Sequence, residues 1–213
     1  MTAESTRGRF IVFEGIDGAG KTTQIELLET YLRERGRKVF RTAEPTDSTI
    51  GRMLRDALSG TVSRTACELA ALFTLDRVSH NVDPENGIGQ ALARGMDVIC
   101  DRYYYSTLAY QGSETDAKWV RDMNLNCPEI RRPDLCVFLD LSPEESMARI
   151  SHRNASREIF ETRERLERVR AQFYRVWDEL PDENVQIADA ARSIEEIQTD
   201  IRRMVDRLTV NET

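Results

Sequence analysis

The sequence contains no long hydrophobic run; the longest apolar stretches, Leu69–Phe73 and Leu135–Leu139, have five residues each. A helix needs about 18 mostly apolar residues in a row to cross a bilayer, so the sequence predicts no membrane-spanning helix. The N-terminal residues Met1–Arg9 are polar and lack the apolar centre of a secretion signal. We therefore expect a soluble, cytoplasmic protein that does not act at a membrane.

Cysteine is scarce, and positive charge does not dominate. The four cysteines are widely spaced, with neither a CxxC pair nor the spacing of zinc ligands. Cys100 and Cys136 fall in apolar segments, which favours buried thiols over a disulfide or a redox role. The 30 basic and 37 acidic residues give a net charge of −7, which argues against nucleic-acid binding. A local basic cleft for a small phosphorylated ligand remains compatible with this balance.

No repeat, low-complexity tract or Pro/Gly-rich linker divides the chain, so we expect one domain over residues 1–213, with flexible polar termini at 1–8 and 207–213. Short apolar runs bounded by turn residues recur along the chain, and the segments between them have the apolar spacing typical of helices. These runs predict strands at Phe10–Phe13, Val39–Phe40, Val98–Cys100, Leu135–Leu139 and Val185–Ile187. Strands that alternate with helices predict an α/β fold with a parallel sheet covered on both faces.

Residues 151–161, with the sequence SHRNASREIFE, interrupt this pattern. They are polar, carry positive charge at Arg153 and Arg157, and lie between two expected helices. One interpretation is a solvated connection. The other is a mobile lid over a site, since loops of this kind often close over substrates.

The clearest motif is GIDGAGKT at Gly15–Thr22, the phosphate loop, which fits G-x-x-x-x-G-K-[ST]. It follows an expected strand and precedes an amphipathic helix, as this motif requires. Glycines permit close backbone approach to an anion, and the loop amides and helix N-terminus direct donors at it. Lys21, one of three lysines in the chain, would bind the β- and γ-phosphates, and Thr22 would bind Mg²⁺. The motif predicts nucleoside-triphosphate binding; a Gly-rich turn into an ordinary helix is the alternative.

The phosphate loop alone does not separate kinases, motor ATPases, GTPases and binding modules. The sequence lacks the guanine-reading N-K-x-D, which argues against a GTPase. It also lacks the strand ending in two acidic residues that motor ATPases usually carry, because Leu135–Leu139 is followed by a single acid, Asp140. Asp101 and Arg102 follow the strand Val98–Cys100, where an acid could hold Mg²⁺ and an arginine could bind a phosphate through two hydrogen bonds.

Several motifs together resemble the thymidylate kinase family. In chain order they are FEGIDGAGKTTQ (13–24), Glu44-Pro45, LFTLDRVSH (72–80), DRYYYSTLAYQG (101–112), RPDLCVFLDL (132–141) and EIFE (158–161). The resemblance spans roughly Phe10 to Val205. It implies a P-loop kinase fold, which is a three-layer α/β/α structure with a five-stranded parallel sheet and a short flexible lid near residues 151–160. It also implies an enzyme that phosphorylates dTMP to dTDP with ATP and Mg²⁺.

On the ATP side, the resemblance implies that Lys21 and the loop amides bind the phosphates and that Arg149 lies over adenine. The implied ATP-binding residues are Gly15, Asp17, Gly18, Ala19, Gly20, Lys21, Thr22, Thr23 and Arg149. Thr22 and Asp101 would organise Mg²⁺. Some relatives carry an arginine in the loop where this chain has Gly18, so we expect Arg153 or Arg157 of the lid to bring positive charge to the transferring group.

On the acceptor side, the resemblance implies that Phe73 stacks on thymine and that Arg77, four residues later, bonds the base; a core position is the alternative for Phe73. Arg102 would bind the monophosphate, and Tyr110 would pack against the deoxyribose. Asp17 would contact the sugar 3′-hydroxyl. The alternative is that its negative charge only stabilises the N-terminus of the following helix. The other implied acceptor residues are Glu44, Pro45, Thr107 and Gln111.

The segment Ala43–Asp47 departs from the family pattern, in which REPGGT is common. One arginine on the phosphate side is missing and an acid appears, and we hypothesise that Arg52 compensates from the next helix. Two alternative functions stay open, another nucleoside or nucleotide monophosphate kinase and a catalytically silent ATP-binding module. Family analogy implies a homodimer, although no surface pattern in the sequence indicates one.

Overall fold

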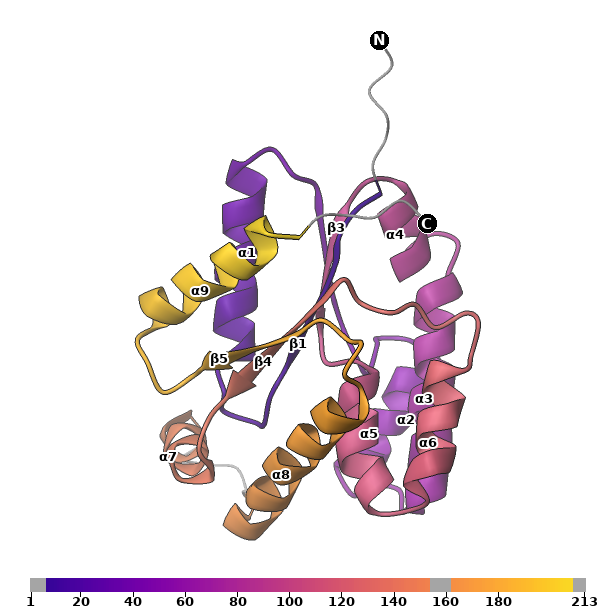
Figure 1. The fold of residues 1–213 in the computed structure, drawn as a ribbon. Helices are drawn as coiled ribbons and strands as arrows, with labels where there is room; N and C mark the ends of the chain where they lie inside the picture. The colour runs from indigo at the N-terminus through magenta and orange to yellow at the C-terminus, as the bar shows by residue number, and fades with distance from the viewer. Residues whose placement is uncertain (1–6, 154–161, 209–213) are drawn as a thin grey trace.

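Five parallel strands form one sheet in the computed structural model, which describes residues 7–153 and 162–208 (Figure 1). The strands are β1 (Phe10–Glu14), β2 (Val39–Ala43), β3 (Asp97–Asp101), β4 (Leu135–Asp140) and β5 (Val185–Asp189). Their order across the sheet is β2-β3-β1-β4-β5. The predicted α/β class and five-stranded parallel sheet are therefore confirmed, and each strand extends one to three residues beyond the apolar run that predicted it.

Helices connect the strands. In the described part of the chain they are α1 (Lys21–Glu34), α2 (Thr49–Leu58), α3 (Ala66–Val82), α4 (Ile88–Ala93), α5 (Tyr104–Tyr110), the short 3₁₀ helix η1 (Gln111–Ser113), α6 (Ala117–Leu125), α7 (Pro143–Arg153), α8 (Arg163–Glu179) and α9 (Ile194–Asp206). Capping boxes start α3 at Thr65 and α9 at Ser193, with Glu68 and Glu196 closing them. None of the described helices has the length and apolar character that a bilayer-spanning helix needs.

The two faces of the sheet carry separate apolar cores because side chains alternate along each strand. Phe10 and Val12 of β1 pack with α4, α5 and α8, whereas Ile11 and Phe13 pack with α1 and α9. Figure 1 shows these two groups of helices on opposite sides of the sheet. The implied three-layer α/β/α arrangement is thus present.

The expected lid can be followed only in part. Helix α7 runs through Arg153, so the first residues of the predicted connection are helical. The remainder, residues 154–161, lies outside the described part of the chain, as do residues 1–6 and 209–213 at the termini. The expectations of a flexible lid and flexible termini therefore stay predictions.

Candidate active site

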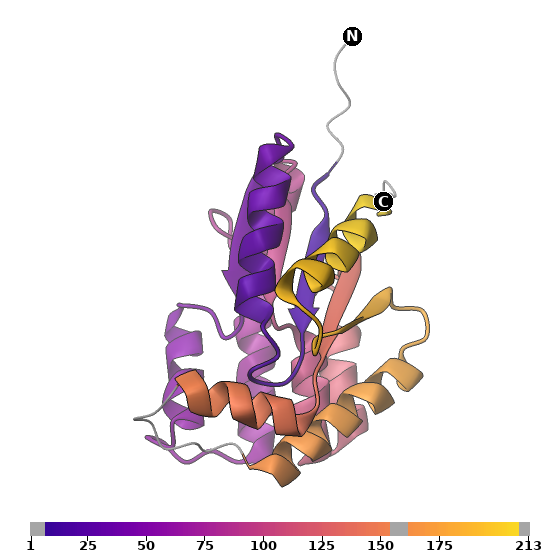
Figure 2. The ribbon, with the colours of Figure 1, turned by 90° about the vertical axis from the view of Figure 1, so that its left-hand side faces the viewer.

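The phosphate loop joins β1 to α1 at the edge of the sheet where the parallel strands end, the usual ligand-binding edge of such sheets. Helix α7 lies below this loop (Figure 2). Gly18 has a φ of 79°, and a Cβ atom at Gly18 would stand 3.0 Å from the carbonyl oxygen of Ser146 in α7. An arginine at position 18 would therefore meet both a disfavoured backbone conformation and a close neighbour.

Lys21 begins α1 and lies over the loop, with 8% of its surface exposed. Its Nζ atom donates hydrogen bonds to the carbonyl oxygens of Gly15 and Ile16, at 3.0 and 3.4 Å. Burial and the nearby positive charge of Arg102 lower the pKa of Lys21 from 10.5 to about 8. Gly20, in the N-cap position, has no side chain to occupy the amides of α1, and the following Thr22 is exposed. The loop therefore presents a cation, a hydroxyl and helix amides together.

Asp101 ends β3, where it pairs in register with Phe13 of β1 and so stands beside the start of the phosphate loop. Its Oδ1 atom is buried and has no hydrogen-bond partner among the described residues. A buried carboxylate oxygen without a partner is costly unless a cation or water satisfies it. Together with the hydroxyl of Thr22 at the end of the phosphate loop, this oxygen fits a Mg²⁺ site in which Asp101 and Thr22 would hold the ion.

Arg102 follows Asp101 in the left-handed backbone region, with a φ of 67°. Its amide donates to the carbonyl oxygen of Phe13 at 2.9 Å, which ties the turn after β3 to β1. Its guanidinium donates to Ser106 Oγ at 3.2 Å and forms an ion pair with Asp17 of the phosphate loop. Burial raises the pKa of Asp17, but the positive charges of Arg102 and Lys21 outweigh it and hold that pKa below its usual value. Asp17 is consequently a hydrogen-bond acceptor at neutral pH.

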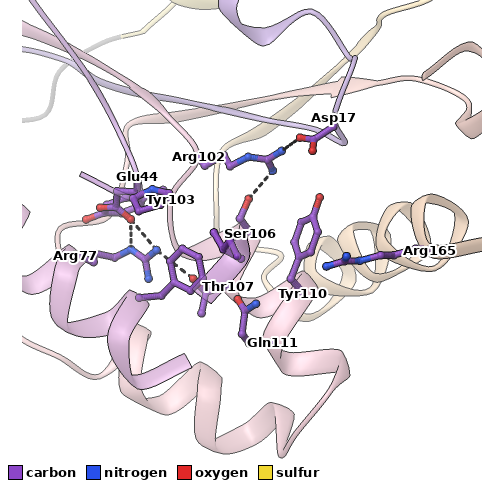
Figure 3. A pocket seen from close by; sticks show the side chains of 13 residues that line it. Asp17, Glu44, Arg77, Arg102, Tyr103, Ser106, Thr107, Tyr110, Gln111 and Arg165 are labelled. Carbon is purple, nitrogen blue, oxygen red and sulfur yellow. Dashed lines mark hydrogen bonds and ion pairs between the residues drawn. The ribbon is translucent and has the colours of Figure 1, made fainter. Parts of the chain in front are cut away.

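A cavity of about 310 Å³ opens beside this ion pair (Figure 3). Its walls come from the phosphate loop, the turns after β2 and β3, and helices α2, α3, α5, η1 and α8. The lining residues are Asp17, Glu44, Pro45, Leu58, Phe73, Arg77, Arg102, Tyr103, Ser106, Thr107, Tyr110, Gln111 and Arg165. Besides Arg52, the sequence assigned nine residues from four separate segments to the acceptor, and all nine line this one cavity.

Arg77 is buried at one end of the cavity, and three side chains hold its guanidinium. Glu44 forms a buried ion pair with it at 2.7 Å, Thr107 accepts a hydrogen bond at 3.1 Å, and Asn124 accepts another. The opposite oxygen of Glu44 lies 3.0 Å from Nδ1 of His80. This network fixes Arg77 before any ligand arrives, so little side-chain entropy is lost when its remaining edge meets a ligand.

Phe73 lies on the same helix face as Arg77 and is half-buried. It lines the cavity and does not belong to either apolar core, which favours contact with a ligand over the core alternative. Tyr110 lines the cavity with its ring fixed at right angles to that of Phe173, at 6.3 Å between centroids. Gln111 is buried beside it.

Arg52 does not take the position that the sequence suggested. It is exposed and donates to the carbonyl oxygen of Asp47 and to Thr49 Oγ1, both at 2.9 Å, and it lies outside the cavity lining. Asp47 is also exposed, so the unexpected acid does not enter the cavity. The altered segment is held instead by Asp76 of α3, which accepts hydrogen bonds from the amide and hydroxyl of Thr46.

Two of the arginines expected to act on ATP, Arg149 and Arg153, belong to α7. Arg149 donates to the carbonyl oxygen of Ala190, in the turn after β5, at 2.9 Å. Arg153 is the last residue of α7, and its side chain lies outside what the structure describes, as does the whole of Arg157. Which of the two reaches the site stays a prediction.

Sequence reasoning missed Glu14, Ser106 and Arg165. Glu14 is fully buried at the end of β1, where burial raises its pKa, and it accepts hydrogen bonds from the amide of Tyr103 at 2.9 Å and from Ser106 Oγ at 2.6 Å. It thereby anchors the start of α5 under Arg102. An acid at the end of an apolar strand was a usable signal for Glu14. Arg165 had none, because α8 contains many arginines.

Comparison with known proteins agrees with this geometry. A family model described as thymidylate kinase matches residues 13–201. A protein of Pyrococcus horikoshii named probable thymidylate kinase is 39% identical over 206 residues, which cover 93% of this chain and 96% of the relative. A thymidylate kinase of Desulfotalea psychrophila is 36% identical over 203 residues, covering 94% and 96%. On its motifs, its fold and these matches, the chain belongs to the thymidylate kinase family.

Proposed function

We propose that this chain transfers the γ-phosphoryl group of ATP directly to the phosphate of dTMP, giving dTDP and ADP for dTTP synthesis. The observation that carries the proposal is the ion pair between Asp17 and Arg102. Asp17 belongs to the phosphate loop and also lines the cavity, so a triphosphate on the loop and a nucleotide in the cavity would meet there. Two bound phosphates in line are the main requirement for phosphoryl transfer.

A pyrimidine nucleotide suits the cavity. The half-buried ring of Phe73 offers a face for stacking, and Arg77, held by Glu44, can donate to a carbonyl oxygen of the base. Tyr110 would pack against the deoxyribose, and the ionised Asp17 can accept a hydrogen bond from the 3′-hydroxyl. Thr107 supports Arg77 from below, so its effect on the base acts through that arginine.

At the transferring group the protein supplies positive charge and position. Lys21, released from the carbonyl oxygens of the loop, would bind the β- and γ-phosphates, and their negative charge would raise its pKa again and keep it protonated. Arg102 would hold the acceptor phosphate, with Arg153 or Arg157 completing the charge from the lid. Asp101 and Thr22 would hold Mg²⁺ with water; when bound, this ion neutralises phosphate charge during transfer.

The decisive experiment is ADP release from Mg-ATP with a panel of dTMP, dUMP, dCMP, dGMP, AMP and UMP. A preference for dTMP supports the proposal. A preference for another nucleotide would keep the kinase assignment and move attention to the altered segment 43–47. ATP binding without any acceptor would favour a catalytically silent module.

A homodimer in the cytoplasm is part of the proposal. Leu75 and Val82 of α3 are each 50% exposed and stand seven residues apart, hence on one side of the helix, which supports a contact between copies there. The four cysteines are free thiols, and Cys100 and Cys136 are buried, as is usual in a reducing compartment. Sedimentation velocity of the wild type and of Leu75→Glu would test the dimer: the proposal expects a dimer that this variant dissociates.

A further inference from the structure

The two ends of the cavity differ in how their charges are arranged. Figure 3 shows Glu44 and Arg77 at one end. Asp17, Arg102 and Arg165 stand at the other, which is the end beside the phosphate loop. Three arginines and two carboxylates therefore share a single lining.

Two arginines of the lining bind carboxylates of the same lining. Arg77 binds Glu44 at 2.7 Å, and Arg102 binds Asp17. Each pair is formally neutral, whereas a nucleoside monophosphate carries a charge of about −1.5 to −2 at neutral pH. Without Arg165 the lining would contain two carboxylates and two arginines, and such a lining would attract an anionic ligand only weakly. Arg165 thus adds a third guanidinium group to a lining that contains two carboxylates.

Arg165 is well placed for this purpose. It lies in the first turn of α8, where its amide donates to Thr162 Oγ1 at 3.2 Å, and the next residue, Leu166, is fully buried. Its backbone is therefore anchored while its half-buried side chain extends beside Tyr110 (Figure 3). Burial raises the pKa of Asp17, whereas Arg102 lowers it and Arg165 adds to that lowering. The charge of Arg165 thus acts at the same end of the cavity as the Asp17–Arg102 pair.

We propose that Arg165 binds the phosphate of the acceptor nucleotide from α8, opposite Arg102, so that two guanidinium groups hold it. This assignment rests on the proposed function and extends it by a specific residue. It also accounts for the departure at Ala43. The end of β2 carries no cation there, and Arg52 points to solvent, so the second positive charge comes from the other wall of the cavity.

The test compares two ligands that differ in the phosphate alone. Dissociation constants for dTMP and thymidine are measured by calorimetry on wild type, Arg165→Gln and Arg165→Lys, with Arg168→Gln as a control of equal charge change. Arg168 is exposed on the same helix and lies outside the lining. Because charge-assisted contacts are among the stronger hydrogen bonds, we expect Arg165→Gln to weaken dTMP binding about 10-fold or more.

Thymidine binding should stay unchanged in Arg165→Gln, Arg165→Lys should recover part of the loss, and Arg168→Gln should match the wild type. Equal weakening of both ligands would overturn the assignment, because it would place Arg165 at the sugar or in the packing of the cavity. Unchanged dTMP binding in Arg165→Gln would overturn it as well. A wild type that binds neither dTMP nor thymidine would instead reject the proposed function, before any variant is compared.

Discussion

Asp17 and Arg102 form an ion pair across 85 residues of sequence, and this contact connects the phosphate loop with the turn after β3. Arg102 is held from three directions, by Asp17, by Ser106 and through its own amide by Phe13. Glu14, buried beneath, fixes the start of α5 on which Ser106 stands. The guanidinium is consequently preorganised at the meeting point of the two proposed substrates.

Replacing Arg102 with alanine tests that position. We expect kcat to fall on the order of 10²-fold or more, because a preorganised donor at the transferring group is lost. ATP binding, measured by calorimetry, should stay close to that of the wild type. Arg102→Lys keeps the charge without the two-pronged geometry and should recover part of the rate. Equal losses in ATP binding and in rate would show that Arg102 serves the triphosphate side.

Phe73 should control the affinity for the acceptor base. Removing the ring in Phe73→Ala should raise KM for dTMP about 10- to 100-fold, since stacking of a base on an aromatic side chain contributes about 1–3 kcal/mol. Phe73→Tyr keeps the ring and is the matched control. Steady-state kinetics with each substrate varied in turn provides the measurement. A fall in thermal stability with an unchanged KM would assign Phe73 to packing.

Lys21 should lower the stability of the ligand-free protein. Its folded pKa of about 8 lies below 10.5, so the unfolded chain binds more protons between these values and stability rises with pH there. The destabilisation by the buried, charged Lys21 is complete below pH 8 and disappears as the pH approaches 10.5. We expect Lys21→Met to stabilise the free protein by about 1–3 kcal/mol at pH 7 while abolishing transfer. Urea unfolding at pH 7 and pH 10 measures the difference, which should shrink at the higher pH; an equal or larger difference at pH 10 would contradict the expectation.

Asp97 should act on stability alone. It is fully buried at the start of β3; burial raises its pKa, but hydrogen bonds from Arg37 and Arg9 outweigh this and lower the pKa to about 2. Because the folded pKa lies below 3.8, the stabilisation is present above pH 4 and is lost as pH falls through 2. Asp97→Asn should destabilise the protein by about 2 kcal/mol or more at pH 7, with both arginines left without their charge partner.

Thermal unfolding of wild type and Asp97→Asn between pH 3 and pH 7 measures this effect. The gap between the two proteins should narrow toward pH 3, and the KM values for both substrates should not change. A raised KM would show that the start of β3 influences the site, contrary to this expectation.

The strands and the phosphate loop could be predicted because local patterns determine them. The run Phe10–Phe13 is apolar on both faces, as a central strand in a covered sheet requires, and the glycines after it mark the turn into α1. The polar residues at the ends of the strands were not predicted to belong to them, so the predicted strands are too short. Asp97 and Asp101 lie outside the predicted run Val98–Cys100, yet both belong to β3. Asp97 is paired with Arg9 and Arg37, and Asp101 pairs in register with Phe13 of β1.

The candidate site was predicted less completely, because long-range pairing decides which side chain reaches it. Arg52 and Arg165 have the same charge and both lie on amphipathic helices. Arg52 forms hydrogen bonds within its own turn, whereas the burial of the neighbouring Leu166 aims Arg165 at the cavity. No local pattern distinguishes these two cases. The partners of Arg77, namely Glu44 and Asn124, likewise become visible once β2, α3 and α6 are packed together.

The strand order has a consequence for how the chain is made. β1 pairs with β3 and β4, and β2 pairs with β3. No pair among the described strands can therefore form before residues 97–101 have been synthesised, which is almost half of the 213 residues. Until then the apolar segment Phe10–Phe13 emerges from the ribosome without a neighbour, a state that invites aggregation. Glu14 can form its hydrogen bonds only after Tyr103 and Ser106 have been synthesised, so the nucleotide site forms late. A nascent chain that ends before these residues gains no stability from ATP binding.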